Sequence, residues 1–381
     1  MGRVLALVAA SYLAIIPATA ATASTASWES WLSFAGIFDV GGPRSDGSLV
    51  VAGLGALYLV DPAGAVTPFA RGPNGYHEDA GAEAYLAVSP GGRVSAAGCN
   101  FVRDETYVLR LHSPIGLNRV SATGDVSGSF TNLTGVTSLN GIVFDTTGAF
   151  DHRLLVSGTS GSNTVIFAVD CTGAAQVITR SAPALEGGLA VAPSGFGSFG
   201  GSLIAPDEFS GNVYSINATG VVSVVAKPEL PTGADIGVEG AGFVPAGLIS
   251  RGGAAYYADR LTPNNPHPGT DALLRLSAGR LAAAGVQDGD LLVATEGGVS
   301  MVALRCSVQC TVLMVVPAPT TAHGEGHLAF TMNPPTGSPI AATPSRTTGA
   351  SSGLGVPTAV LVLLLALLAG AGLLIRRRRR P

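Results

Sequence analysis

Five segments of the sequence repeat one chemical pattern, in which a carboxylate or amide residue precedes a small residue and a short apolar run. The repeated polar residues are Glu83, Asn140, Glu186, Glu239 and Glu325. The residues that follow them read AYLAV, GIVFD, GGLAV, GAGFV and GHLAF, respectively. Oxygen atoms of carboxylates and amides are the ligands that hard cations prefer. If the fold brings these five residues together, they therefore predict a metal site.

The spacing of these residues indicates a repeated structural unit. The gaps between successive members are 57, 46, 53 and 86 residues, and the last gap is about twice a 43-residue unit. Each member is followed by further short apolar runs that end in Gly, Asp or Asn, such as SLIAPDEFSG at residues 202–211. Short apolar runs separated by such turn residues predict antiparallel strands.

Four strands in each unit of roughly 40 to 55 residues are typical of a β-propeller. Six such units fill residues 48–332, so we expect an all-β, six-bladed β-propeller, with five or seven blades as alternatives. The first unit lacks an innermost strand, and we expect the extra strand at residues 325–332 to complete it. The least regular part is the junction of the fifth and sixth units, where RLAAAGVQDG makes a poor inner strand.

The innermost strands of a propeller line its central channel, so Glu83, Asn140, Glu186, Glu239 and Glu325 are expected to form a ring. Four carboxylates held close together raise one another's pKa values unless a cation compensates them. Ca²⁺, which takes six to eight oxygen ligands, is the ion predicted first, and Mg²⁺ or Mn²⁺ come next. The alternative is that the ring lines a wide, water-filled channel or bonds backbone amides at the strand ends.

Three histidines lie near the same predicted rim. His77 precedes an inner strand, while His323 and His327 flank Glu325. They could supply a general base or further metal ligands; the alternative is that they are solvated loop histidines. Five other charged residues end second strands, where we expect hairpin-turn or inter-blade contacts. These are Asp207, Glu208, Asp259, Arg260 and Glu296.

Both ends of the chain predict targeting segments. Residues 1–21 combine one positive charge, an apolar stretch and a small-residue end, which is the pattern of a secretory signal peptide. Residues 356–375 are uncharged and long enough to span a bilayer, and five arginines follow at 376–380. Positive charge stays in the cytoplasm, so the preceding domain is expected to lie outside, anchored to the membrane by this C-terminal helix. The helix and arginine cluster together resemble bacterial C-terminal sorting signals, without an LPxTG-like motif.

The expected domain order follows from these segments. It is a signal peptide at 1–21, a lead-in at 22–47, the propeller at 48–333, a stalk rich in Pro, Ser, Thr and Gly at 334–355, the transmembrane helix at 356–375 and a cytoplasmic tail at 376–381.

Cysteine and charge content narrow the environment and the partners. The spacing of Cys306 and Cys310 predicts a disulfide across a hairpin end; Cys99 and Cys171 could form a second, although sequence alone does not fix the pairing. Without the arginines of the two targeting segments, 15 basic residues remain against 25 acidic ones. A strongly acidic domain is a poor partner for nucleic acid, which requires a basic face.

Over residues 48–332 the sequence resembles six-bladed propellers of the gluconolactonase, senescence-marker and strictosidine-synthase type, together with NHL-repeat proteins. The resemblance rests on repeat length and on the polar ring at the inner strands. In lactonases of this type, a channel Ca²⁺ is held by a glutamate, asparagines and an aspartate. By strand location, the matching positions are the five ring residues, which contain more Glu and less Asn than those relatives.

Two functions are consistent with this pattern. The first is a membrane-anchored propeller that binds a small-molecule or protein ligand without catalysis. The second is a metal-dependent hydrolase of the lactonase or esterase type. A quinone-dependent sugar dehydrogenase is disfavoured because Arg, Lys and His are scarce in the propeller region. The sequence contains no Cys/His nucleophile arrangement and no phosphate-binding loop.

Overall fold

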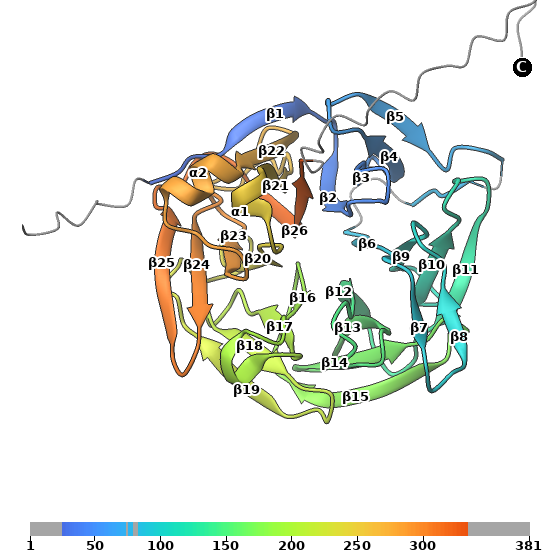
Figure 1. The fold of residues 1–381 in the computed structure, drawn as a ribbon. Helices are drawn as coiled ribbons and strands as arrows, with labels where there is room; N and C mark the ends of the chain where they lie inside the picture. Colours follow the sequence, from blue (N-terminus) through green and yellow to red (C-terminus); the bar gives the residue numbers. More distant parts are fainter. Residues whose placement is uncertain (1–24, 74, 79–82, 334–381) are drawn as a thin grey trace, which may run out of the picture. The chain divides into compact units, whose positions relative to one another are not determined.

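The computed structural model describes residues 25–73, 75–78 and 83–333. These residues form six four-stranded antiparallel sheets arranged as a ring around a central axis (Figure 1). The six-bladed β-propeller predicted from the sequence is therefore confirmed. The chain divides into two compact units, Met1–Thr336 and Gly337–Pro381, and all of the described residues belong to the first.

Four blades are built from consecutive stretches of chain, each running from the axis outward. The first comprises β2 (Ile37–Gly41), β3 (Leu49–Gly53), β4 (Ala56–Val60) and β5 (Val66–Phe69). The second comprises β6 (Leu86–Val88), β9 (Thr106–Arg110), β10 (Gly116–Val120) and β11 (Ser127–Asn132), with the hairpin β7 (Gly92–Val94) and β8 (Cys99–Phe101) inserted after β6. The third comprises β12 (Ser138–Phe144), β13 (Leu154–Ser160), β14 (Asn163–Val169) and β15 (Ala175–Ala182). The fourth comprises β16 (Ala190–Val191), β17 (Leu203–Pro206), β18 (Val213–Ile216) and β19 (Val222–Ala226), with a 3₁₀ turn at Gly197–Phe199.

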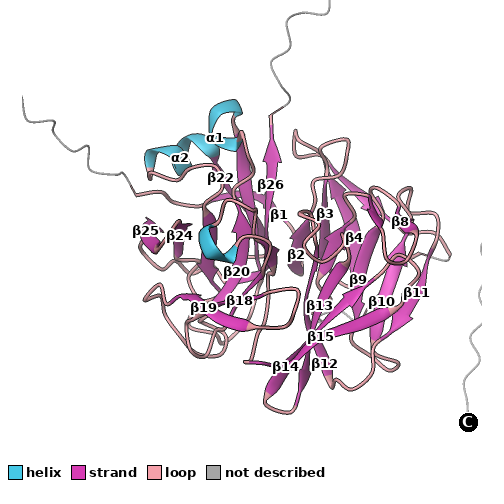
Figure 2. Ribbon diagram, turned by 60° about the horizontal axis from the view of Figure 1, so that its bottom comes forward, coloured by secondary structure: helices cyan, strands magenta, loops and turns pink. Residues whose placement is uncertain are grey.

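The fifth and sixth blades are interleaved. The fifth comprises β20 (Val238–Phe243), β23 (Leu291–Thr295), β24 (Met301–Cys306) and β25 (Cys310–Val316). After β20 the chain passes through α1 (Leu248–Arg251) into the next sheet, where it forms the hairpin β21 (Gly253–Asp259) and β22 (Ala272–Ser277). The helix α2 (Ala278–Ala283) then leads back to β23. Figure 2 shows α1 and α2 side by side next to β22.

This interleaving explains why the junction of the fifth and sixth units is the least regular part of the repeat. Residues 254–260 follow Glu239 along the chain, but the second strand that pairs with the inner strand of Glu239 is β23. The weak inner strand expected at RLAAAGVQDG is the helix α2 and its following turn. Alanine favours helix, the Ser277 hydroxyl accepts a hydrogen bond from the Arg280 amide at the N-cap, and Gly285 adopts a φ of +87° beyond the helix.

The ring is closed within the sixth blade, which contains both ends of the propeller. Its order from the axis outward is β26 (Gly324–Met332), β21, β22 and β1 (Glu29–Ser33). The prediction that the C-terminal strand would complete the first blade was therefore wrong, because that blade has its own inner strand, β2. The predicted lead-in at 22–47 contains both β1 and β2. The apolar pattern of the sequence did not indicate β2, because a charged residue, Asp39, lies fully buried at the centre of this strand.

Apolar side chains between neighbouring blades form the core, and two disulfides add covalent links. Cys99 of β8 bonds Cys171 of the third blade across 72 residues, and Cys306 bonds Cys310 across the end of the β24–β25 hairpin. Both predicted cysteine pairs are present. They fit a protein that folds in an oxidising compartment.

The predicted targeting segments fall largely outside the described residues. This holds for the signal peptide, the stalk, the transmembrane helix and the arginine tail. In the part of the chain that the structure describes, no helix is long and apolar enough to cross a membrane.

Candidate functional site

The six inner strands begin at the same end of the channel. Later residues of β2, β6, β12, β16, β20 and β26 all line one cavity at the opposite end, so these strands run in the same direction. Glu239 and Glu325 are each the second residue of an inner strand, and Glu83 lies just before β6. The repeated pattern in the sequence therefore brings carboxylates from separate blades to one mouth of the channel.

Irregular pairing helps to turn these side chains towards the axis. The register between inner and second strand shifts across Asn140 in the third blade and across Glu239 in the fifth. A β-bulge of this kind leaves one residue unpaired and changes the direction of its side chain. A similar irregularity follows Glu325, where Gly326 adopts a φ of +70°. A Cβ atom on Gly326 would lie 2.4 Å from a carboxylate oxygen of Asp39, so glycine is required there.

Three charged residues at the ends of second strands reach the same mouth. Arg260 directly follows β21, Glu296 directly follows β23, and Glu208 lies two residues after β17. An antiparallel second strand ends beside the start of its inner strand, which places its last residues at the acidic end. The expected inter-blade contacts are confirmed for Arg260, which contacts Glu83, and for Glu296, which contacts His323.

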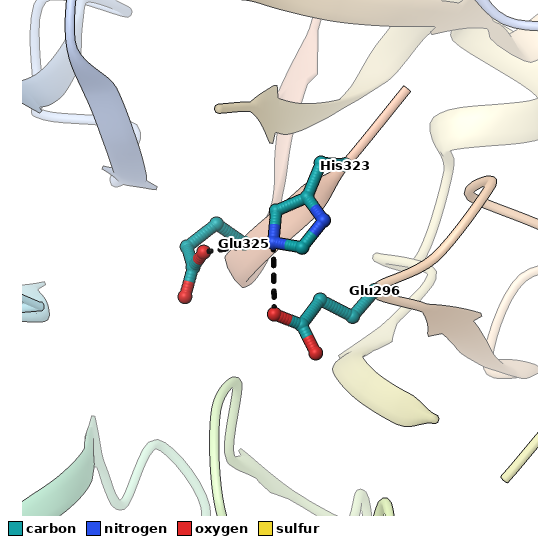
Figure 3. Close-up of side chains that lie close together, drawn as sticks. All are labelled: Glu296, His323 and Glu325. Carbon is teal, nitrogen blue, oxygen red and sulfur yellow. Dashed lines mark ion pairs between the residues drawn. The ribbon is translucent and has the colours of Figure 1, made fainter. Parts of the chain in front are cut away.

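Glu296, His323 and Glu325 form the tightest cluster at the mouth (Figure 3). His323 Nε2 lies 2.9 Å from Glu296 Oε1 and 3.9 Å from Glu325 Oε2. One donor atom from each of the three side chains lies within 4.8 Å of the others, and all three residues are buried. Backbone contacts fix this arrangement, because the Gly324 amide donates to the Glu296 carbonyl and the His323 amide donates to Asp259 Oδ1.

Glu239 joins this cluster through a buried tyrosine. The hydroxyl of Tyr85 lies 2.9 Å from Glu239 Oε1 and 3.0 Å from Glu325 Oε1. The Gly326 amide also donates to Glu239 Oε1, at 3.1 Å. The Tyr85 hydroxyl has one hydrogen, so it donates to only one of the two carboxylates. The other contact is a hydrogen bond only when that second glutamate is protonated and donates to the Tyr85 oxygen.

Arg260 supplies a permanent positive charge at the mouth. Its Nη1 atom lies 2.5 Å from Glu83 Oε1 and 3.3 Å from Glu325 Oε2. Burial lowers the pKa of the guanidinium, but Glu325 and Glu83 together outweigh burial and raise it. The structure thus brings three of the five predicted ring residues, Glu83, Glu239 and Glu325, into one network.

The other two predicted ring residues lie beside that network. Asn140 is held by hydrogen bonds with Ser138 and Thr159. With Glu186 and Glu208, it lines a separate cavity of about 190 Å³. The metal role predicted for Asn140 and Glu186 stays a prediction, and the hydrogen bonds of Asn140 occupy the groups that would have to bind an ion.

The carboxyl groups of the mouth resist ionisation. Burial, followed by the charges of neighbouring carboxylates, raises the pKa of Glu208, Glu296 and Glu325 to about 8 in each case. The same causes raise the pKa of Glu239 well above its usual value and that of Glu186 by a smaller amount. Arg260 therefore compensates only part of the negative charge, and a further cation would stabilise the ionised forms.

The three histidines occupy different environments. His77 is exposed, whereas His323 and His327 are only 2% and 8% exposed, so the reading of all three as solvated loop residues was wrong. Burial lowers the pKa of His323. The positive charge of Arg260 lowers it further, and the nearby carboxylates raise it without reversing the net decrease. His323 is therefore a neutral imidazole, the form that binds metals.

His327 links blades across the axis below the acidic mouth. Its Nε2 atom donates to the Ile142 carbonyl at 2.7 Å, and its Nδ1 atom lies 3.0 and 3.1 Å from the two oxygens of Asp39. The second Asp39 oxygen also accepts a hydrogen bond from the Leu86 amide. Burial opposes protonation of His327, but Asp39 and Ile142 outweigh it and raise its pKa. One ion pair thus joins the inner strands of the first, second, third and sixth blades.

The donor set of the cluster fits a divalent cation. Two carboxylates and one imidazole are common ligands of Zn²⁺ and Mn²⁺. The Nε2 atom of His323 faces both carboxylates, at 2.9 Å from Glu296 Oε1 and 3.9 Å from Glu325 Oε2, so the three donor atoms converge on one point. Glu296, His323 and Glu325 are therefore the residues that could hold the ion, with Glu239 adjacent.

Neither the family models nor the curated proteins compared with this sequence match it. Several solved propellers are similar in structure. One chain of a nidogen/laminin complex shares 10% identity and a TM-score of 0.47, over 78% of this chain and 85% of that one. A calcium-binding regucalcin from Agrobacterium tumefaciens shares 11% identity and a TM-score of 0.45, over 79% of each chain. A putative gluconolactonase shares 13% identity and a TM-score of 0.43, over 78% of this chain and 83% of that one. At these values the similarity carries no argument about activity.

The raised pKa values predict that metal-free protein loses stability as pH rises. The folded state retains protons on Glu208, Glu296 and Glu325 up to about pH 8, whereas the unfolded chain releases them near pH 4.5. The stabilisation is therefore complete below pH 4.5 and is lost as pH rises through 8. We expect the melting temperature in EDTA to fall on the order of 5 °C between pH 6 and pH 9. Calorimetry at a series of pH values measures this, and a melting temperature that rises over that interval would refute the assignment.

The axial ion pair predicts a large effect of Asp39→Asn. The substitution leaves His327 without its buried counter-charge, and removing one partner of a buried pair costs about 3–5 kcal/mol. Urea unfolding of the full-length chain should show this decrease in the free energy of unfolding. The control Asp46→Asn, in an exposed turn, should change it by less than about 1 kcal/mol. Equal effects of the two substitutions would show that the pair does not hold the blades together.

Proposed function

We propose that this protein is an exported, membrane-anchored β-propeller that binds a divalent cation at the acidic mouth of its channel and, through that cation, an oxygen-bearing ligand. The observation that carries the proposal is the buried cluster of Glu296, His323 and Glu325, whose donor atoms lie within 4.8 Å of one another. The surplus of carboxylates around it supports the same conclusion, since a dication would relieve their mutual repulsion.

The imidazole of His323 bears on the identity of the ion. Ca²⁺, which the glutamate ring suggested from sequence, takes oxygen ligands in large number. An imidazole beside two carboxylates favours Mn²⁺ or Zn²⁺ instead. Two or three protein ligands at a channel mouth leave positions for water or for an anionic group of the ligand. This is the arrangement that a binding protein needs for carboxylates, phosphates or sugar hydroxyls.

A hydrolase of the lactonase or esterase type is the second candidate. The observation in its favour is Glu239, a buried carboxyl group with a raised pKa, which is bonded to Tyr85 beside the cluster. A carboxyl group that burial keeps protonated in this way can donate a proton as a general acid. Turnover of a panel of lactones and esters by the metal-loaded protein, and its loss in Glu239→Gln, would separate this function from binding alone.

The cellular location proposed here rests on the sequence of the two ends. The apolar helix at 356–375 and its arginines would anchor the chain, and the leader at 1–21 would export the propeller. Both disulfides support placement outside the cytoplasm.

Metal binding by matched glutamine variants tests the proposal. The full-length chain, purified in detergent and stripped with EDTA, should bind about one equivalent of Mn²⁺ or Zn²⁺ in calorimetric titration and should melt several degrees higher when loaded. Glu296→Gln and Glu325→Gln should weaken binding at least tenfold. At pH 8, both metal-free variants should also melt above the metal-free parent, because each substitution removes one repelling carboxylate.

The control is Glu105→Gln. Glu105 is a buried glutamate at the opposite end of the second blade, where it bonds Tyr107. This variant should bind metal as the parent does. Unchanged binding in Glu296→Gln and Glu325→Gln, or the absence of binding in the parent, would overturn the proposal.

A further inference from the structure

The end of the channel opposite the acids contains a cavity that the metal site does not use. Its volume is about 360 Å³, and residues from all six inner strands line it. The His327 ring forms part of the lining and is bonded to Asp39 and Ile142. None of the charged residues of the acidic mouth lines this cavity, so we treat the two ends of the channel as two chambers.

Most of the lining of this cavity is apolar. Large apolar side chains come from five different inner strands or from the residues just before them. Examples are Leu86, Ile142, Leu189, Phe243, Leu328 and Phe330. An apolar cavity gains little from water and binds apolar molecules instead. Volumes above about 300 Å³ lie in the usual range of small-molecule sites.

Small residues are part of the lining. Neighbouring inner strands approach closely at two glycines, since a Cβ atom on Gly41 would lie 2.4 Å from Leu86 Cδ1, and one on Gly242 would lie 2.8 Å from the Leu328 carbonyl oxygen and from Phe330 Cε2. Ala87 and Ala190 also line the cavity, and a larger side chain at either position would take up part of its volume.

Arg103 is the permanently charged side chain of the lining, and it is exposed. His327, which also lines the cavity, is bonded to Asp39. No carboxylate of the described residues pairs with the Arg103 guanidinium, since the nearby Asp104 carboxylate accepts hydrogen bonds from Ser45. The cavity therefore combines an apolar interior with an unpaired positive charge at its edge, which complements an anion carrying an apolar chain.

We propose that this cavity binds one medium-chain aliphatic carboxylate, with its chain inside the cavity and its carboxylate at Arg103. A cavity of about 150 Å³ holds a benzene ring, so this volume accommodates roughly ten to fifteen non-hydrogen atoms, the size of decanoate. A guanidinium binds a carboxylate through two parallel hydrogen bonds. The inference does not depend on the metal proposal, because the two chambers share no ligand-binding residue.

Calorimetric titration with decanoate tests this proposal, using the full-length chain in one detergent so that partition into micelles is the same for every variant. The parent should bind one decanoate with a submillimolar dissociation constant and bind decyltrimethylammonium at least tenfold more weakly. Arg103→Gln should lose this preference for the anion, whereas the control Arg93→Gln, on the exposed hairpin β7–β8, should retain it.

Substitutions that fill the cavity with a larger side chain are the second part of this test. Ala190→Phe and Ala87→Leu, on inner strands of different blades, should each weaken decanoate binding at least tenfold while Mn²⁺ binding at the mouth is unchanged. Because either substitution could impair folding, an aliphatic diazirine analogue of decanoate should also be photo-crosslinked to the parent. Labelling should map to peptides of β12, β20 or β26. Binding that is unaffected by the filling variants, equal binding of the cationic chain, or labelling only outside the inner strands would overturn the proposal.

Discussion

The crowding of carboxylates at one end of the channel is the constraint on which the remaining features depend. Six inner strands run in one direction, so polar residues at their starts must meet. Glu239 and Glu325 share the Tyr85 hydroxyl, and Glu325 also contacts Arg260 and His323. Burial strengthens every one of these interactions, favourable and unfavourable. The mouth is therefore stable only with bound protons or with a bound cation.

The ion pair between Asp39 and His327 holds the ring of blades closed close to the crowded carboxylates. Asp39 and His327 join strands from the first and last blades, where the two ends of the propeller come together. The β1 strand completes the same seam from outside by pairing with β22. The channel has a chamber lined by carboxylates at one end and a chamber lined mostly by apolar side chains at the other. A single propeller thus offers two ligand environments on one axis.

The sequence predicted the repeated part of the site better than its composition. The pattern around Glu83, Glu239 and Glu325 recurs, so it indicated both the propeller and the acidic mouth. His323 and Glu296 were noted separately, and only the rule that antiparallel second strands end beside the starts of inner strands would have grouped Glu296 with His323 and Glu325. Asp39 was missed because a buried charge interrupts the apolar pattern of β2. The exchange of the β21–β22 hairpin between blades is invisible to local patterns, since a hairpin has the same sequence signature in either sheet.

Anomalous X-ray scattering from crystals soaked in Mn²⁺ tests the central claim most directly, because it locates the ion rather than its consequences. The account predicts one strong peak at the acidic mouth, about 2.0 to 2.3 Å from a carboxylate oxygen of Glu296, from one of Glu325 and from His323 Nε2. In crystals of Glu325→Gln the peak should weaken or vanish. Crystals that show no peak among these side chains at saturating Mn²⁺, or a peak only at surface carboxylates, would contradict it.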